Sequence, residues 1–248
     1  MKGILYFSST GNSLYLAKRI RERIPAHILY LPRYAGDGSE FDEVILVTPV
    51  YSFGLPVHSY DVLQRLCNDV PLTVVLTYGG ATGGAERLVA ELARRGNKNL
   101  RGVYAIQMPE DYTLTFTTPK IYEKLVLRLA EKKIDRVIDA ILRAELHLPA
   151  EGRMRETLYE KNKSNWHLIG RDFSATEDCV QCGKCIAICP AGNIALEDGK
   201  VRFGDRCVAC LGCYHRCPQK AIVYKHRRKK DRYINPKIRE AEIGENFL

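Results

Sequence analysis

Eight of the nine cysteines fall in one short segment and form two copies of the same run. The first copy reads Cys179-x-x-Cys182-x-x-Cys185-x-x-x-Cys189-Pro190, and the second reads Cys207-x-x-Cys210-x-x-Cys213-x-x-x-Cys217-Pro218. Three closely spaced thiolates can surround three corners of one [4Fe–4S] cube. The fourth cysteine of each run cannot easily reach back to the same cube, and the proline that follows it helps to turn the chain away.

The spacing therefore predicts two clusters that exchange their fourth ligands. We assign one cluster to Cys179, Cys182, Cys185 and Cys217. We assign the other cluster to Cys207, Cys210, Cys213 and Cys189. The alternative is structural zinc, but zinc sites usually use two separated Cys-x-x-Cys pairs. Cys67 lies outside this pattern, and we interpret it as a small buried hydrophobic residue.

Over about 50 residues, this segment resembles the bacterial two-cluster ferredoxins, since all eight ligands and both Cys-Pro pairs are present. The resemblance implies one-electron transfer at low potential. His215 lies inside the second run, where it could hydrogen-bond a cluster sulfur, but we interpret it as an exposed side chain.

Before the cysteines, five apolar strand-like stretches alternate with helix-like stretches. We expect strands at 2–7, 27–31, 43–48, 72–78 and 102–108, and helices at 13–24, 57–67, 85–95 and 120–145. Strands that are apolar throughout and separated by helices indicate a parallel sheet covered on both faces. The predicted fold class is α/β, a doubly wound five-stranded parallel sheet, followed by a second, small α+β domain that holds the cysteines.

Three loops leave the carboxyl ends of these strands, where ligands bind in open α/β sheets. Ser8-Ser9-Thr10-Gly11-Asn12-Ser13 offers amides and hydroxyls that can surround a phosphate at a helix N-terminus. The loop at 48–56 contains Pro49, Val50, Tyr51, Phe53 and Gly54, and the loop at 77–84 contains Tyr78, Gly79 and Gly80. Their aromatic rings can stack on a flavin, and their glycines allow close approach of the backbone. The first loop has no lysine, which excludes a Walker A motif.

Together the three loops resemble flavodoxin over about 145 residues, and Ser-x-Thr-Gly-x-Ser is close to that family's pattern. The resemblance implies a flavodoxin-like sheet and FMN, with the phosphate at Ser8–Ser13 and the ring between the other two loops. The alternative is a degenerate pocket that holds no flavin. Because the two ring loops contain no Asp or Glu, we expect a less negative potential for the fully reduced flavin than in acidic flavodoxins.

The whole arrangement resembles the fused flavodoxin–ferredoxin (EFR) family of anaerobes. We predict an FMN-binding domain at 1–147, a linker with a short helix at 148–175, a two-cluster ferredoxin domain at 176–226 and a basic polar tail at 227–248. The implied function is electron transfer between two [4Fe–4S] clusters and FMN, converting one- and two-electron chemistry in anaerobic metabolism. The alternative is an FMN-dependent reductase of a small or macrocyclic substrate, favoured mildly by the long segment Pro109–Pro119.

The formal net charge of +9 overstates the charge of the loaded protein, because oxidised clusters would each add roughly −2. The basic run Lys225–Arg232 is interpreted as a solvated segment or as a docking site for an acidic redox partner protein. No recognisable nucleic-acid-binding motif accompanies it, so no nucleic acid is expected. No apolar run has the length of a membrane span or of a signal-peptide core, so we expect a cytoplasmic protein without a membrane partner.

Overall fold

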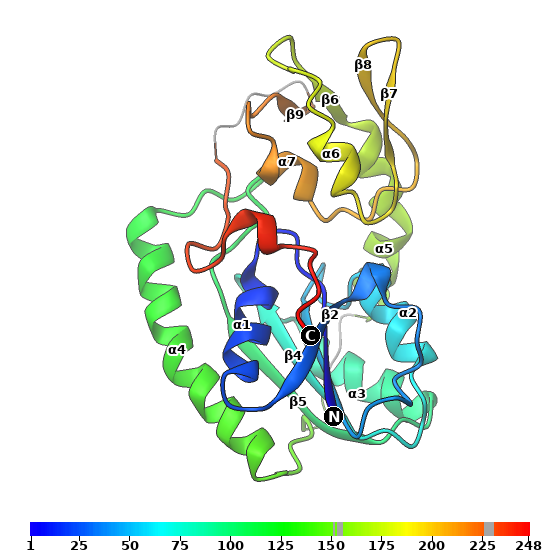
Figure 1. The fold of residues 1–248 in the computed structure, drawn as a ribbon, viewed down its shortest axis with the longest axis vertical. Coiled ribbons are helices and arrows are strands. Elements are labelled where there is room, and N and C mark those ends of the chain that lie inside the picture. Colours follow the sequence, from blue (N-terminus) through cyan, green and yellow to red (C-terminus); the bar gives the residue numbers. More distant parts are fainter. Residues whose placement is uncertain (151, 153–155, 226–230) are drawn as a thin grey trace.

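The N-terminal half of the chain is a five-stranded parallel sheet with helices on both faces (Figure 1). The computed structural model describes residues 1–150, 152, 156–225 and 231–248. The strands are β1 (Lys2–Tyr6), β2 (Ala26–Tyr30), β3 (Val44–Pro49), β4 (Leu72–Tyr78) and β5 (Leu100–Gln107). The helices are α1 (Asn12–Arg21), α2 (Val57–Arg65), α3 (Ala85–Arg95) and α4 (Lys120–Leu142), with a 3-10 turn η1 at Leu31–Arg33.

The strand order is β2-β1-β3-β4-β5, and every neighbouring pair is parallel. Helices α1 and α4 pack together on one face, and α2 and α3 pack together on the other. Both central strands β3 and β4 are buried at every position except the last, as expected for strands covered on two sides. This order is that of flavodoxin-like sheets, in which ligands bind near the β1/β3 reversal, so the predicted fold class is confirmed.

The cysteine segment forms a small α+β unit whose two halves repeat each other. Its elements are β6 (Phe173–Ala175), α6 (Lys184–Ala187), β7 (Ile194–Glu197), β8 (Lys200–Phe203), α7 (Gly212–Arg216) and β9 (Ile222–Tyr224). The repeat seen in the sequence is visible in space, because α6 and β7 of the first half correspond to α7 and β9 of the second. Strand β6 pairs with β9 and β7 pairs with β8, both antiparallel.

The segment predicted to be a linker with a short helix contains α5 (Glu156–Arg171), a helix of 16 residues. Its Tyr159 and Trp166 are buried in the main core of the N-terminal half. The Tyr159 hydroxyl donates to the Leu55 carbonyl at 2.8 Å. Helix α5 is thus packed against the sheet domain on its way to the cysteine unit (Figure 1).

The last residues, predicted to be a polar tail, pack onto the N-terminal half. Phe247 forms an antiparallel bridge with Ile28 on the outer edge of β2. The buried Tyr6 hydroxyl donates to the Glu245 carbonyl at 2.9 Å and accepts from the Gly244 amide at 2.9 Å. A 3-10 turn η2 at Glu240–Glu242 lies in the same segment. Most of the basic run falls at 226–230, outside the described residues.

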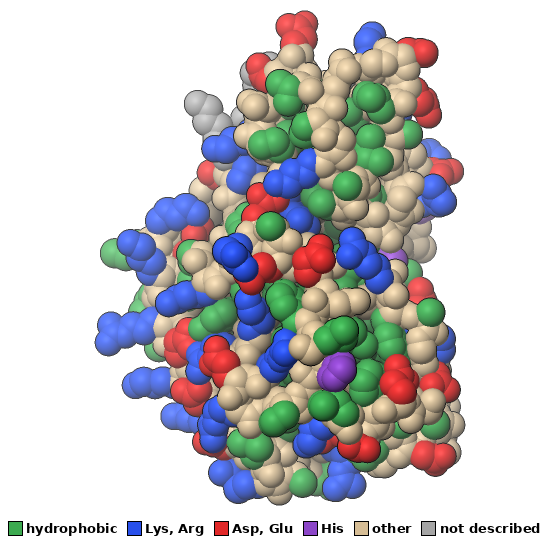
Figure 2. All heavy atoms as spheres, viewed as in Figure 1, with side chains coloured by type: hydrophobic (Ala, Val, Ile, Leu, Met, Phe, Trp, Pro, Cys, Tyr) green, Lys and Arg blue, Asp and Glu red, His purple; other side chains and the backbone are tan. Residues whose placement is uncertain are grey.

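Charge on α4 is divided between its two sides. Glu131 and Asp135 both form ion pairs with Arg19 of α1, and Asp139 pairs with Arg23 beyond the end of α1. Lys and Arg side chains project from the outer edge of the molecule formed by α4, as Figure 2 shows. Helix α4 carries six of the 38 Lys and Arg residues of the chain.

The Tyr6 contacts predict a measurable stabilisation by the C-terminal segment. Tyr6→Phe leaves the Gly244 amide buried without its acceptor, which costs about 1–3 kcal/mol. We expect the midpoint of thermal unfolding of the loaded protein to fall by about 2–8 °C. Tyr122→Phe is the matched control, because Tyr122 is 46% exposed on α4. Equal midpoints for the two variants would contradict this account.

Candidate functional site

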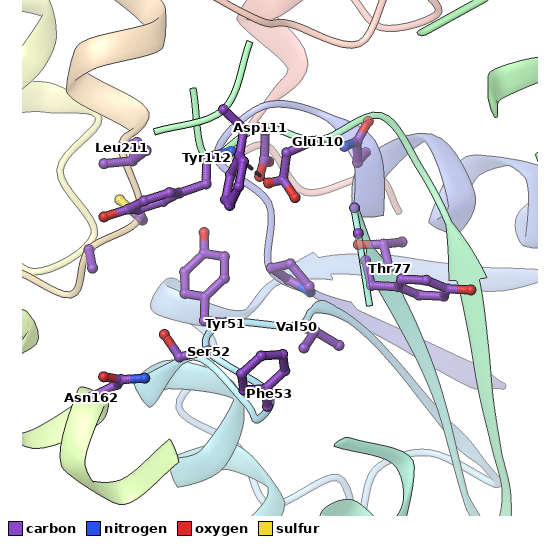
Figure 3. Close-up of a pocket in the computed structure, with 18 of the residues that line it drawn as sticks. Val50, Tyr51, Ser52, Phe53, Thr77, Glu110, Asp111, Tyr112, Asn162 and Leu211 are labelled. Atoms are coloured by element: carbon purple, nitrogen blue, oxygen red, sulfur yellow. Dashed lines mark hydrogen bonds between the residues drawn. The ribbon is translucent and has the colours of Figure 1, made fainter. Parts of the chain in front are cut away.

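A cavity of about 600 Å³ lies at the carboxyl ends of β3, β4 and β5. The sheet domain contributes three loops to it, α5 contributes one wall, and the second cysteine run contributes another. Figure 3 shows Glu110, Asp111 and Tyr112 facing Tyr51 and Val50 across this space. The lining residues are Asn12, Pro49, Val50, Tyr51, Ser52, Phe53, Thr77, Tyr78, Gly79, Gly80, Ala81, Pro109, Glu110, Asp111, Tyr112, Phe116, Asn162, Asn165, Trp166, Ile169, Ala209, Cys210 and Leu211.

The loop after β3 presents Tyr51 to the cavity through a tight turn. Tyr51 and Gly54 exchange two backbone hydrogen bonds of 2.9 and 3.0 Å, and Ser52 and Phe53 between them have φ of 50° and 71°. The Phe53 ring packs directly on Gly83, where a Cβ atom would lie 2.1 Å from it. The Tyr51 ring makes an edge contact with the Trp166 ring at 6.1 Å between centroids. The rings of Tyr51 and Trp166 thus lie together at one side of the cavity.

The loop after β4 depends on glycine for close packing. A Cβ atom at Gly79 would lie 2.2 Å from the Glu110 carboxylate, so only glycine allows that side chain to lie over the loop. Gly80 meets nothing within 4 Å and leaves its backbone open to the cavity. Of the eight residues predicted to hold the ring, seven line the cavity. The exception is Gly54, which packs beneath the Tyr159 ring.

The predicted phosphate loop Ser8–Ser13 is buried and leads directly into α1. Gly11 has φ of 97°, a conformation that favours glycine, and no side chain caps the first amides of the helix. The Ser8 hydroxyl accepts from the Gly11 amide at 3.0 Å, which holds the loop curved. These features suit an anion at the positive end of α1. Of the six loop residues, only Asn12 lines the cavity.

Side chains far away in the sequence complete the phosphate loop. The Thr10 hydroxyl donates to the Asp111 carboxylate at 2.6 Å, and the backbone amide of Asn235 donates to the Thr10 carbonyl at 2.8 Å. The Asn12 side-chain oxygen accepts from the Tyr233 hydroxyl at 2.7 Å and from the Asn235 side chain at 3.0 Å. Local sequence reasoning missed this cover, because no pattern near residues 8–13 signals a partner more than 200 residues later.

His215 connects the cysteine unit to the cavity, and the prediction that it is exposed was wrong. The side chain is buried, and its Nδ1 accepts from the Tyr233 amide at 3.1 Å. The other ring nitrogen, Nε2, therefore carries the proton and donates to the Asp111 carbonyl at 2.8 Å. Burial lowers the pKa of His215 to about 4.

The expected absence of Asp and Glu around the flavin ring holds only for the two ring loops. Glu110 and Asp111 bring two carboxyl groups into the same cavity from the segment after β5. Burial raises the pKa of Asp111 to about 6, with the Thr10 hydrogen bond opposing and the Glu110 charge adding to the rise. The premise for a less negative flavin potential is therefore removed.

The cysteine thiols of the two runs lie close enough to influence one another. Burial raises the pKa of Cys185, and the nearby Cys179 and Cys217 raise it further. Burial also raises the pKa of Cys213, and Cys210, Cys207, Cys189 and Cys185 add to the rise. Each of these two thiols thus has a thiol of the other run as a neighbour, and the exchanged ligation stays a prediction.

Backbone amides point at several of these sulfurs. The Asn193 amide donates to Cys189 Sγ at 3.2 Å, and the Ala221 amide donates to Cys217 Sγ at 3.3 Å, at equivalent places in the two repeats. Such donors stabilise negative charge on a cluster and raise its potential. Within the described residues, no three His, Cys, Asp or Glu side chains converge on a single ion. The corners of a cube do not require such convergence, because each thiolate binds a different iron.

The two cysteine sets differ in position. Cys210 lines the cavity and is the second-largest cause of the raised pKa of Tyr51, after burial. Cys182 of the other set is exposed. One set is thus next to the cavity, and the other reaches solvent. Cys67 is partly buried and follows the end of α2, outside both sets.

Comparison with known proteins identifies the cysteine unit. Residues 178–222 match the family described as a 4Fe-4S dicluster domain. Pyruvate synthase subunit PorD of Methanocaldococcus jannaschii is 38% identical over 64 residues, which cover 25% of this chain and 74% of that protein. One subunit of the ion-translocating oxidoreductase complex of Methanosarcina acetivorans is 39% identical over 59 residues, 23% of this chain and 22% of that protein.

Polyferredoxin protein MvhB of Methanothermus fervidus is 37% identical over 46 residues, 18% of this chain and 11% of that protein. The chain thus spans about three quarters of PorD but much less than half of the other two relatives. The FMN-bound flavodoxin of Fusobacterium nucleatum has a TM-score of 0.42 and 15% identity, covering 57% of this chain and 96% of its own. Among helices of the described residues, none is long and apolar enough to cross a membrane.

The strand order and the cysteine unit together define a fused flavodoxin–ferredoxin protein. By its C-terminal unit the chain belongs to the 4Fe–4S dicluster ferredoxin family, as the match at 178–222 and the similarity to PorD show.

The position of Trp166 predicts a simple binding signal. It is the only tryptophan of the chain, and it lines the cavity beside Tyr51. We expect riboflavin or FMN added to flavin-free protein to quench tryptophan emission in a saturable way, because the ring would lie within contact distance. In Trp166→Phe, the protein emission and its quenching should both be lost. Quenching no greater than that of free N-acetyltryptophanamide would contradict binding in this cavity.

Proposed function

We propose that this chain transfers electrons between two [4Fe–4S] clusters, held by the eight cysteines, and FMN, held in the cavity at the edge of the sheet. One observation carries the proposal: Ala209, Cys210 and Leu211 form a wall of that cavity. A ligand thiolate of one cluster and the space for the flavin ring are therefore in direct contact. When bound, FMN supplies both one- and two-electron chemistry beside one-electron clusters.

The residues of the chain fit this role. Asn12 and the amides at the start of α1 would hold the phosphate, and Tyr51, Tyr78 and the Gly79-Gly80 backbone would hold the ring. Trp166 and Ile169 of α5 close one side of the cavity and limit the entry of water. The cluster held by the set containing Cys210 would lie next to the flavin, and the cluster held by the set containing the exposed Cys182 would meet an external donor or acceptor.

Protein partners are part of the proposal. The relatives are named as subunits of pyruvate synthase and of an ion-translocating oxidoreductase complex. By likeness, we propose that this chain exchanges electrons with other redox proteins. At the two described ends of the basic run, Lys225 pairs with Asp172 and Arg232 lies 3.3 Å from the centre of the Tyr214 ring. Docking of an acidic partner at the basic run would therefore depend on the residues between Lys225 and Arg232.

A second candidate is an FMN-dependent reductase of a small or macrocyclic substrate. The observation in its favour is Asp111, whose pKa of about 6 allows a carboxyl group in the cavity to hold a proton near neutral pH. Phe116, 56% exposed, also lies at the rim of the cavity on the long segment after β5. Consumption of a candidate substrate by protein reduced without oxygen would favour this function over transfer between proteins alone.

The exchanged ligation predicts opposite outcomes for two double variants. Cys189→Ser with Cys213→Ser removes two ligands of one cluster, so about four of eight irons should remain per chain. Cys185→Ser with Cys189→Ser removes one ligand from each cluster, so both clusters should be lost or damaged. Iron and acid-labile sulfide assays measure the outcome, with Cys67→Ser as the control that keeps all the iron. If each run ligated its own cluster, the two results would be reversed.

The function itself is tested on protein purified without oxygen. We expect about one FMN and eight irons per chain, and loss of the oxidised flavin spectrum when a one-electron donor reduces the protein. In Cys207→Ser, which removes a ligand of the cluster next to the cavity, flavin reduction should be slowed. Zinc in place of iron would overturn the proposal. Iron without flavin would leave a ferredoxin whose sheet domain has another role.

A further inference from the structure

The strongest unexplained contact in the cavity is the one between Asp111 and the phosphate loop. The Thr10 hydroxyl, buried in the middle of that loop, donates to Asp111 Oδ2 at 2.6 Å. Asp111 also lines the cavity, so its carboxyl group lies where the loop meets the space for the flavin. A carboxylate is an unusual neighbour for a loop whose geometry suits an anion, because the two negative charges repel.

The part of the cavity wall that the structure describes brings no cation to Asp111. Among the described residues that line the cavity there is no Lys, Arg or His. The titratable groups facing Asp111 are Glu110 on the same segment, Tyr51 after β3, His215 on α7 and Tyr233 near the C-terminus. Tyr51 also has the Cys210 thiol as a neighbour. Each of these groups is neutral or negative at neutral pH, since His215 is buried and neutral.

We propose that Asp111 makes flavin-phosphate binding depend on pH: the Ser8–Ser13 loop takes a phosphate monoester only when the Asp111 carboxyl is protonated and donates a hydrogen bond to it. This inference rests on the proposed FMN site. It assigns Asp111 control over whether the phosphate binds, a role separate from that of the residues that hold the ring.

The sign of the pH dependence follows from linkage. The pKa of Asp111 without flavin is about 6, and a phosphate beside it raises that pKa further. Binding therefore takes up a proton, and the affinity falls as the pH rises above about 6, by up to about tenfold per pH unit. The phosphate alone, with a second pKa of about 6, would give the opposite trend if the loop preferred the dianion.

The test is titration of FMN into flavin-free protein under anoxic conditions at pH 6.5, 7.5 and 8.5, followed by flavin fluorescence. We expect the wild-type Kd to rise by about tenfold per pH unit. Asp111→Asn keeps an acceptor for Thr10 without the charge, so its Kd should be nearly constant and about tenfold or more lower than wild type at pH 8.5. Glu110→Gln, the matched control in the same cavity, should retain the wild-type slope. The Kd of the wild type for riboflavin, which lacks the phosphate, should not change with pH.

Several results would overturn the inference. A wild-type affinity for FMN that is independent of pH, or the same slope in Asp111→Asn, would refute it while leaving the proposed function intact. If neither protein bound FMN at any pH, both would fall. Calorimetry of the wild type in buffers of different ionisation enthalpy gives a second measurement that needs no variant. It should show uptake of about one proton per FMN at pH 7.5, and no uptake would also refute the inference.

Discussion

The packing of the cysteine unit against the carboxyl edge of the sheet is the constraint on which the site depends. Leu114, from the segment after β5, is buried in the core of the cysteine unit beside Tyr214. Ala209, from the second cysteine run, is buried in the core of the sheet domain. Each unit thus contributes an apolar side chain to the core of the other. The cavity lies at this junction, which is why a ligand cysteine forms part of its wall.

Two long-range connections stabilise the junction. Helix α5 runs from the sheet domain to the cysteine unit with Tyr159 and Trp166 buried on the way. The C-terminal segment returns past α7, where the Tyr233 amide bonds His215, and then covers the phosphate loop through Asn235. His215 in turn donates to the segment that carries Asp111. Movement of the cysteine unit would therefore displace residues at both the ring space and the phosphate loop.

Local patterns predicted the parts of this protein that local chemistry determines. The cysteine spacing, the apolar strands and the glycine-containing loops each carry their signal within about ten residues, and the fold class and the two ring loops of the cavity followed from them. The cover of the phosphate loop by Asn235 and the burial of His215 did not follow, because they arise from contacts between distant segments. The contact of Asp111 with the phosphate loop did not follow either, since its hydrogen bond with Thr10 joins two loops about 100 residues apart.

The central claim is that the flavin space adjoins the cluster bound by Cys210 and not the other cluster. Electron paramagnetic resonance of the reduced clusters, with and without bound FMN, tests it most directly. The account predicts that FMN alters the signal of one cluster only, and that this is the signal lost in Cys207→Ser. A change confined to the signal lost in Cys182→Ser would contradict the account.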